Sequence, residues 1–540
     1  MGQGSVSGVS TIPSIMSQPS VRSWSSRSPR TGSGALNPAL RLAVERVVSQ
    51  ICRDQLVLSH TAGYLKEFTI FQNVEESDIE DVMRLAHQDT RAKRAIGSMV
   101  GMAVADSVGG LFEFLPVGTE GSRFDAKTLK ACGVYNKFAL KPGQWTDDTS
   151  MSLCMADSLL VCNGYDGRDI RIRFWNWWER GYNNTFRLDS ERHESVGLGG
   201  NVSLSLLIMT RKTTLEPRYE GLGEDAGNGS IMRLAPVPIF FHSDLELAIQ
   251  VSAESSYTTH PGSGAADACA FLGFLIIRAI KRDARCRKSA KRFLDECATE
   301  YLARPEVQRQ PALLKLLRSK EPSKSKERCW NWRDPKGPYL LETIANRGKF
   351  YNGYPVQADY FGSYSMDGLA IALHSMYHTK SFMAAITRCV NCLGDADSTG
   401  AICGQLAGAF YGVDAIDDRL ISRLRKWDTG QIALRGALLY VLGVDLPQDV
   451  KDRAAMDSAG VLATHRGGDH PSVEVPHAYG AMLSDLRAQE ALNRDTAGAD
   501  AAVRAALLLP PETAGHAPAP PSSKRPNLLV TPAARPLKRQ

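Results

Sequence analysis

LGDADSTGAICGQLAGAFYG, from Leu393 to Gly412, is the stretch that decides the fold, because glycine recurs in it at every fourth position. Residues four apart lie on one face of an α-helix. A glycine inside a helix costs about 1 kcal/mol relative to alanine, so a row of four needs a compensating reason. Close approach of another helix supplies one, since a bare ridge lets two backbones come near. The stretch therefore predicts a closely packed helix.

A second row of small residues lies near the N-terminal side, in GSMVGMAVADSVGGLFE, which runs from Gly97 to Glu113. Here Gly97, Gly101, Ala105 and Gly109 recur at the same spacing. From about residue 92 to 443 the apolar pattern has mainly a helical period, with few alternating β-branched runs. The sequence predicts an all-α fold with one large helical domain and disordered ends.

The composition divides the chain into four parts. Residues 1–36 are a Ser-rich leader that we expect to be disordered, because such a segment cannot bury enough apolar surface. Residues 37–91 are predicted to be a helical extension that begins at Asn37-Pro38. Residues 92–447 form the large domain, with a charged insertion at about 318–336 predicted as a surface loop. Residues 448–540 are predicted to be a mostly disordered basic tail.

Bulk properties restrict the class of protein. The 540 residues are 43% hydrophobic and 23% charged, and the net charge of +6 is too modest to indicate nucleic-acid binding. Eleven scattered cysteines indicate reduced thiols and a cytoplasmic protein. The longest apolar run, 268–280, is too short to span a bilayer. The acid-free, Ser-rich leader also resembles the disordered secretion signals of translocated bacterial effectors.

Two acidic clusters are the candidate functional residues. The first is Thr146-Asp147-Asp148, and the second is Asp395-Ala396-Asp397-Ser398. Each lies at a predicted helix start, where acidic and hydroxyl side chains commonly act as caps. Neighbouring carboxylates with a hydroxyl are also the oxygen ligands that a hard cation prefers. The residues alone leave both interpretations open.

Three kinds of metal site compete for the second cluster. An EF-hand loop fails because its twelfth position is Leu406 where a bidentate glutamate is required. The Asp-x-Asp-x-Thr motif of haloacid-dehalogenase-like phosphatases matches, but it should follow a buried strand, and residues 381–391 are predicted to be helical. The third possibility joins both clusters in one site, since two metal ions need several carboxylates.

Five motifs together resemble the ADP-ribosylglycohydrolase family, which includes the dinitrogenase-reductase-activating glycohydrolases. They occur in the family's order and cover roughly residues 92–443: GSMVGMAVADSVGGLFE (97–113), QWTDDT (144–149), GNGSIMRLAP (227–236), SYTTH (256–260) and LGDADSTGAICGQLAGAFYG (393–412). The resemblance implies an all-helical fold with two Mg²⁺ ions, for which Mn²⁺ can substitute, in a central cleft.

The resemblance also implies roles for individual residues. The metal ligands would be Thr146, Asp147, Asp148, Asp395, Asp397 and Ser398. Ser398 stands where threonine is common in the family, and Leu393-Gly394 stands where two glycines are usual. Cleavage at the ribose anomeric carbon needs a positioned water and a carboxylate base. Asp147, Asp148 and Glu113 are the candidates for that base.

The same match suggests which residues bind substrate. Gly227, Asn228, Gly229 and Ser230 would contact phosphate and ribose, since glycines let backbone N–H groups approach an anion, and His260 would face the ADP moiety. The expected substrate is an ADP-ribosylated protein side chain or a small molecule containing ADP-ribose. The alternatives are an inactive binder of ADP-ribose or of ADP-ribosylated protein, and a metal-dependent phosphatase. Oligomeric state is not predicted.

Other signals favour structural roles. Cys389 and Cys392 have redox or zinc spacing but no second cysteine pair. His374 and His378 lie one turn apart without the glutamate of a metalloprotease motif, and a surface or core position is expected for them. Trp175, Trp177 and Trp178 are predicted to be packing aromatics of a helix.

Overall fold

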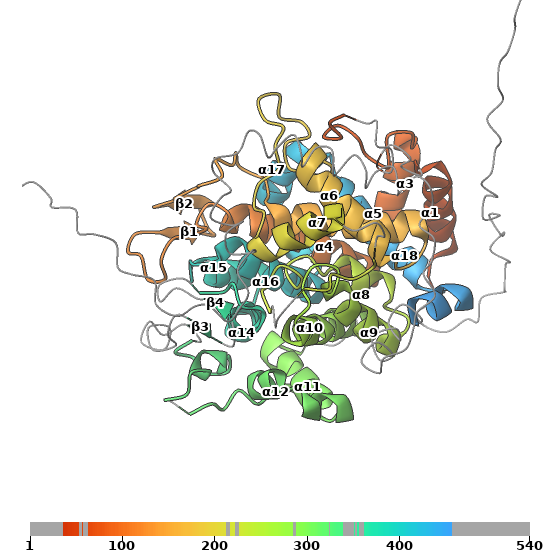
Figure 1. Ribbon diagram of the computed structural model, residues 1–540. Helices are drawn as coiled ribbons and strands as arrows, with labels where there is room; N and C mark the ends of the chain where they lie inside the picture. Colours follow the sequence, from red (N-terminus) through yellow and green to blue (C-terminus); the bar gives the residue numbers. More distant parts are fainter. Residues whose placement is uncertain are drawn as a thin grey trace, which may run out of the picture.

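A computed structural model describes residues 36–52, 57, 63–211, 216–221, 226–283, 288–322, 324–337, 350–351, 354–355 and 361–455. Figure 1 shows a body made almost wholly of helices. The α-helices are α1 (Pro38–Gln50), α3 (Glu76–Ala86), α4 (Thr90–Gly109), α5 (Asp147–Cys162), α6 (Gly167–Arg180), α7 (Gly200–Arg211), α8 (Pro236–Phe240), α9 (Leu245–Ser256), α10 (Ser263–Lys281), α11 (Ala290–Leu302), α12 (Pro311–Arg318), α14 (Ser365–Tyr377), α15 (Phe382–Val390), α16 (Ala396–Tyr411), α17 (Asp418–Asp428) and α18 (Gln431–Gly443). Short 3₁₀ turns are η1 (Pro305–Arg309), η2 (Arg328–Trp330) and η3 (Val413–Ala415).

Strands are few in the described part of the chain. β1 (Arg123–Asp125) pairs antiparallel with β2 (Lys130–Cys132), in a register that places Phe124 opposite Ala131. β3 (Phe350–Tyr351) pairs antiparallel with β4 (Tyr354–Pro355). Neither ladder is large enough to form a core, which confirms the predicted all-α class.

Helices α4 and α16 form the centre of the domain and carry the two glycine rows against each other (Figure 1). A Cβ added at Gly97 would stand 2.5 Å from the carbonyl oxygen of Gly408, and one at Gly101 would stand 2.5 Å from that of Gly404. Real Cβ atoms do not approach backbone oxygens so closely, so the helices pack backbone to backbone. This contact is the compensation that the glycine rows required.

Helix α10 is a long, strongly apolar helix of the core. It is 19 residues long with a mean hydropathy of 1.6, so length and composition alone would let it cross a membrane. The apolar run at 268–280, predicted to be too short to span, is thus extended by the helix at its N-terminal end. However, 78% of this window is buried inside the protein, as expected of a central core helix.

The N-terminal extension begins where the sequence predicted. Asn37 caps α1, since its Oδ1 accepts a hydrogen bond of 2.9 Å from Ala39 N, and Pro38 occupies the first turn. At the other end of the domain, residues 448–455 are helical, so ordered structure passes the predicted boundary at 447. The predicted disorder of residues 1–35 and 456–540 lies outside the described residues.

The charged segment at 318–336, predicted as a surface loop, also contributes two tryptophans to the interior. Its charged residues are exposed or partly buried, whereas Trp330 and Trp332 are completely buried. Trp330 Nε1 donates to Asp367 Oδ1 at 2.7 Å, and Trp332 Nε1 donates to Leu316 O at 2.8 Å. Buried indole N–H groups need such acceptors. The two tryptophans therefore fix this segment to the domain, which its charge content concealed.

Candidate active site

Both acidic clusters lie at helix starts, as predicted, but the side chains at the two N-cap positions do not hydrogen-bond to their own helices. Thr146 is the N-cap of α5 and Asp395 is the N-cap of α16, and neither side chain makes a capping hydrogen bond. Asp147 and Asp148 occupy the first turn of α5, where the helix dipole favours negative charge. The capping interpretation does not account for the side chains of Thr146 and Asp395, whose oxygens point elsewhere.

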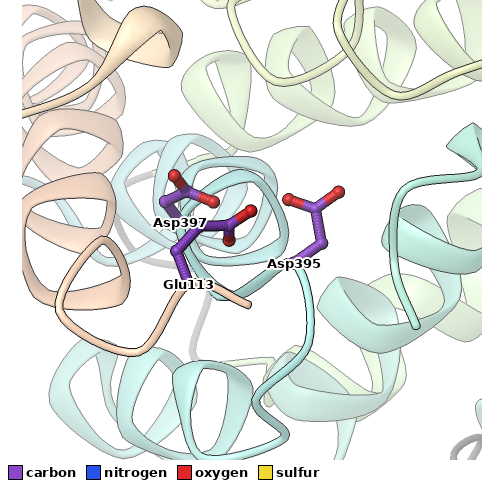
Figure 2. A group of neighbouring side chains, drawn as sticks. All are labelled: Glu113, Asp395 and Asp397. Carbon is purple, nitrogen blue, oxygen red and sulfur yellow. The ribbon is translucent and has the colours of Figure 1, made fainter. Parts of the chain in front are cut away.

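The end of α4 brings Glu113 to the second cluster. Phe114 N donates to Gly394 O at 3.1 Å, and Gly394 N donates to Leu115 O at 2.8 Å. Glu113 Oε2 also accepts from Ala396 N at 3.1 Å. Carboxylate oxygens of Glu113, Asp395 and Asp397 lie within 4.8 Å of one another and point toward a common space (Figure 2). Glu113, predicted as a catalytic residue, is thus also placed where it could bind a metal ion.

Thr146 connects the first cluster to the second. Its Oγ1 lies 3.2 Å from Asp148 Oδ2 and 3.4 Å from Asp397 Oδ2, although 251 residues separate Thr146 from Asp397. Asp148 Oδ1 is buried without a hydrogen-bond partner among the described residues. A buried, unpartnered carboxylate oxygen is costly unless a cation occupies the space beside it. The set of oxygens therefore fits a hard divalent metal ion.

Electrostatics show the cost of gathering these acids. Burial raises the pKa of Asp148 well above its usual range, and the nearby charges of Asp106, Asp397, Asp147 and Asp395 raise it further. Burial and the charge of Asp397 likewise raise the pKa of Asp395, against a lowering hydrogen bond from Asn228. Like charges in one buried site oppose ionisation. A bound cation would remove this opposition.

Asp147 lies slightly nearer the surface than Asp148. Its side chain is 7% exposed, against 0% for Asp148, and burial followed by the charge of Asp397 raises its pKa. Gly197, at φ +93°, lies directly against the Asp147 carboxylate, and a Cβ there would overlap it. Only a glycine both adopts this backbone conformation easily and leaves room for the carboxylate.

The glycine-containing loop at 227–230, predicted to contact phosphate and ribose, reaches the second acidic cluster through Asn228. Gly227 forms an antiparallel bridge with Tyr364. Asn228 Nδ2 donates to Asp395 Oδ2 at 2.8 Å and to Gly362 O at 3.1 Å. Ser230 does not point to the same place, because its Oγ accepts from Ser256 Oγ at 2.8 Å in the interior. The structure therefore brings Asn228 to the acids and gives Ser230 a packing contact.

His260 is buried beside this loop. A Cβ added at Gly229 would stand 2.8 Å from His260 Cε1, so Gly229 is what lets the loop lie on the imidazole. Burial and the nearby charge of Arg233 lower the pKa of His260 to about 3. His260 Nδ1 lies 2.8 Å from Thr259 Oγ1, which accepts from Arg233 Nη2 at 2.6 Å. His260 is consequently neutral at physiological pH.

The remaining predicted ligand, Ser398, has a partner other than a carboxylate. Its Oγ lies 3.5 Å from Met232 Sδ, a weak acceptor, and its backbone N donates to Asp397 Oδ1 at 2.8 Å. The turn before it contains the departure from the double glycine. Leu393 has φ +62° and Gly394 has φ +71°, so a buried leucine occupies a conformation that costs a branched residue about 1–2 kcal/mol.

Comparison with known proteins identifies the family. A family model described as ADP-ribosylglycohydrolase matches residues 87–452, which is more than half of the chain. The chain belongs to the ADP-ribosylglycohydrolase family. It is 28% identical over 331 residues to the ADP-ribosylarginine hydrolase Tri1 of Serratia proteamaculans, covering 61% of this chain and 75% of that protein. It is also 28% identical over 361 residues to the ADP-ribosyl dinitrogen reductase glycohydrolase of Rhodospirillum rubrum, covering 65% of this chain and 97% of that protein.

Family membership decides between the alternatives left by the sequence. This ADP-ribosylglycohydrolase is an enzyme that hydrolyses glycosidic bonds, and not merely a binder. The phosphatase alternative required a strand before Asp395. The structure has helix α15 there, with Ser381 as its N-cap. That alternative is therefore wrong.

Asp106 also lies at the site, although the motifs assign it no role. It is fully buried in α4 and accepts hydrogen bonds from the backbone and hydroxyl groups of both Thr146 and Thr149. A signal was available, because a carboxylate interrupts a row of small residues in a helix that is otherwise apolar there. An acid in such a place needs buried partners.

The tryptophans, histidines and cysteines for which structural roles were predicted lie mostly in the interior. Trp175 and Trp177 are buried in α6. His374 is buried, with Nδ1 3.1 Å from Trp332 O and Nε2 2.7 Å from Arg388 Nη2. Cys389 and Cys392 are buried thiols whose Sγ atoms donate to Thr399 O and Arg388 O, respectively. These residues serve the packing of the domain.

Proposed function

We propose that this ADP-ribosylglycohydrolase uses two Mg²⁺ ions to hydrolyse the N-glycosidic bond between ADP-ribose and an arginine side chain of a modified protein. The observation that carries the metal dependence is the convergence of two acidic clusters, 251 residues apart, on the Thr146 hydroxyl. The names of the relatives, an ADP-ribosylarginine hydrolase and a dinitrogen reductase glycohydrolase, support a protein substrate.

The donor set fits magnesium better than a softer metal. Carboxylate and hydroxyl oxygens of Thr146, Asp147, Asp148, Asp395, Asp397 and Ser398 would hold the ions, and Glu113 lies close enough to join them. The group of described residues drawn in Figure 2 consists of three carboxylates. Softer metals prefer cysteine or histidine ligands, and this group contains neither. When bound, the ions supply positive charge that holds ribose hydroxyls and increases the acidity of water.

The protein's own groups supply orientation and a base. Asn228, tied to Asp395, would orient the ribose at the acids, while the neutral His260 would meet the ADP moiety without repelling or strongly attracting its phosphates. A base must reach the attacking water. Asp147 and Glu113 are 7% and 5% exposed, whereas Asp148 is completely covered. We therefore assign proton removal to Asp147 or Glu113 and a purely ligating role to Asp148.

A substrate panel tests this proposal. The full chain is incubated with arginine-linked and serine-linked ADP-ribosyl peptides, with Mg²⁺ or with a chelator, and free ADP-ribose is measured by mass spectrometry. We expect release from the arginine-linked peptide only when Mg²⁺ is present. Release that is equal with and without the metal would disprove metal dependence. Release only from the serine-linked peptide would disprove the acceptor.

Variants separate the base from the ligands. Asp147→Ala should abolish measurable hydrolysis at saturating Mg²⁺, and a rate near that of the unaltered protein would sink the scheme. Glu113→Gln should lower the rate while substrate binding persists, if Glu113 removes the proton. Isothermal titration with ADP-ribose reports that binding directly. An unchanged rate in Glu113→Gln assigns the base to Asp147.

Localisation stays a prediction. A cytoplasmic location is expected from the cysteine content, and the leader suggests export as a translocated effector. Fusing residues 1–50 to a translocation reporter tests export. A reporter that remains inside the producing cell would rule out the leader as a secretion signal.

A further inference from the structure

Asp106 is a buried carboxylate for which the proposed reaction gives no direct role. It is 0% exposed and lies near the C-terminal end of α4, between the central glycine row and the start of α5. An ionised carboxylate in such a position is expensive unless its oxygens accept several hydrogen bonds. No lysine, arginine or histidine of the described chain donates to it.

All four donors to Asp106 come from the first turn of α5. Oδ1 accepts from Thr146 N at 3.0 Å and from Thr146 Oγ1 at 2.9 Å. Oδ2 accepts from Thr149 N at 3.0 Å, from Thr149 Oγ1 at 2.6 Å and, more weakly, from Thr146 N at 3.3 Å. Both oxygens of Asp106 are thus occupied by donors from Thr146 and Thr149. Asp106 replaces the N-cap side chain that Thr146 does not provide, but from a different helix.

This arrangement determines the direction of the Thr146 hydroxyl. A hydroxyl has one proton, yet Thr146 Oγ1 is within 3.4 Å of three carboxylate oxygens, from Asp106, Asp148 and Asp397. The shortest contact, 2.9 Å, is to Asp106 Oδ1, so this carboxylate is the best-placed acceptor for the hydroxyl proton. When the Thr146 hydroxyl donates to Asp106, the lone pairs of Oγ1 are left to face Asp148 Oδ2 and Asp397 Oδ2. These three oxygens would then offer ligands to a cation.

We propose that Asp106 is a positioning residue that aims the Thr146 hydroxyl oxygen at the metal site and fixes the first turn of α5 beneath it. The inference rests on the proposed metal-dependent function, and it adds a residue that supports the metal ligands without touching the ion. Groups that orient metal ligands from behind typically change metal affinity 10- to 100-fold when they are altered.

Asp106→Asn in the full chain tests the inference. The amide keeps the size of the carboxylate but places an NH₂ group against two donors, so the Thr146 or Thr149 contacts are lost. Titration calorimetry with Mg²⁺ should show affinity about 10- to 100-fold weaker than in the unaltered protein. Raising Mg²⁺ should restore much of the hydrolysis rate, because the ligands themselves remain. A purely structural role for Asp106 would not give this dependence on metal concentration.

Asp157→Asn is the matched control. Asp157 is also a buried carboxylate, in the middle of α5 itself, but it pairs with Arg435 Nε at 2.7 Å and not with a metal ligand. This control should lower the thermal midpoint and leave Mg²⁺ affinity within about twofold. Thr149→Val removes one donor to Asp106 and should weaken Mg²⁺ affinity about threefold. This variant carries the test if Asp106→Asn lacks the far-ultraviolet circular dichroism of the unaltered chain.

The outcomes distinguish two kinds of failure. If the unaltered protein binds Mg²⁺ and Asp106→Asn binds it equally well, the positioning role is wrong and the proposed function stands. If Asp106→Asn does not fold, Thr149→Val decides the question. If Thr149→Val binds Mg²⁺ as tightly as the unaltered protein does, the positioning role is wrong. If the unaltered protein does not bind Mg²⁺, both the proposed function and this inference fall.

Discussion

Helix α5 carries buried carboxylates at two places, and the two differ in the partners that compensate their charge. Asp157, in the middle of the helix, receives Arg435 Nε at 2.7 Å, Tyr182 OH at 2.6 Å and Asn183 Nδ2 at 2.7 Å. Asp148, in the first turn, has one oxygen without a hydrogen-bond partner in the part of the chain that the structure describes, and it is surrounded by other acids. Both side chains are 0% exposed. Burial is therefore equal, and only the partners differ.

The difference teaches how to separate structural from functional charge. Burial would raise the pKa of Asp157, but Arg435, Arg173 and Tyr182 outweigh it and lower that pKa. At Asp148 burial and the neighbouring charges act in the same direction and raise the pKa. A fold that needed only stability would not retain the second arrangement. The unbalanced end of α5 is where the proposed cation would supply the missing positive charge.

Asp148→Asn should have the largest effect on activity. Loss of a metal ligand should reduce hydrolysis at saturating Mg²⁺ about 1000-fold, or about 4 kcal/mol of transition-state stabilisation. In a chelator the same variant should unfold at a higher temperature than the unaltered protein, because one buried like charge is gone. Initial rates and thermal melts measure the two effects. A rate within tenfold of the unaltered protein would contradict the assignment.

Arg435→Met removes the cation that pairs with Asp157 in the middle of α5. The substitution breaks this ion pair and leaves the buried carboxylate the hydrogen bonds from Tyr182 and Asn183. Removing one partner of a buried ion pair costs about 3–5 kcal/mol. Urea unfolding should show this loss, while the folded fraction keeps its Mg²⁺ affinity. The double variant with Asp157→Asn should recover part of the stability, because no uncompensated charge remains. If Arg435→Met unfolds at the same urea concentration as the unaltered protein, the two ends of α5 do not differ as described.

Mg²⁺ itself should stabilise the fold by a smaller amount. At a concentration 100 times its dissociation constant, a ligand that binds only the native state contributes about 2.7 kcal/mol. The thermal midpoint should rise with added Mg²⁺ in the unaltered protein and in Arg435→Met, but not in Asp395→Asn. An equal rise in all three would indicate binding away from the acidic clusters.

The central helix pair was predictable because its signal is local. Four-residue spacing of glycine appears within each stretch, and the cost of those glycines predicts close packing before any partner is known. The helical segment before Asp395 was predictable in the same way, and it excluded the phosphatase. The two buried tryptophans of the charged segment were not predictable, because the acceptors of their indole N–H groups, Asp367 and Leu316, lie outside that segment. The small β-ladders are local hairpins, but strands of two or three residues are too short to show an alternating pattern.

The site was predictable in its list of residues but not in its connections. The motif match named both acidic clusters, Glu113 and Asn228. It could not show that Glu113 lies beside Asp395 and Asp397, since that depends on the pairing of Phe114 with Gly394. Asp106 was missed because its partners are about 40 residues away and its own motif describes it only as an interruption. Spacing reports which residues share an element, and tertiary contacts decide which oxygens converge.

Asp267 is a third acid of the interior, with fewer partners than Asp157 and no neighbouring acids like those of Asp148. Its replacement should change the free energy of unfolding least. It lies in α10 with Gln310 Nε2 at 2.5 Å, and burial raises its pKa to about 7. A carboxyl with a raised folded pKa contributes stability below about pH 4, its unfolded pKa, and that contribution is lost as pH rises toward 7. Asp267→Asn should therefore stabilise the protein by about 1 kcal/mol at pH 8 and by less at pH 5, since the buried amide keeps part of the desolvation cost. Urea unfolding at both pH values measures this difference. A loss of stability at pH 8 would show that the charged form of Asp267, like that of Asp157, is balanced by the fold.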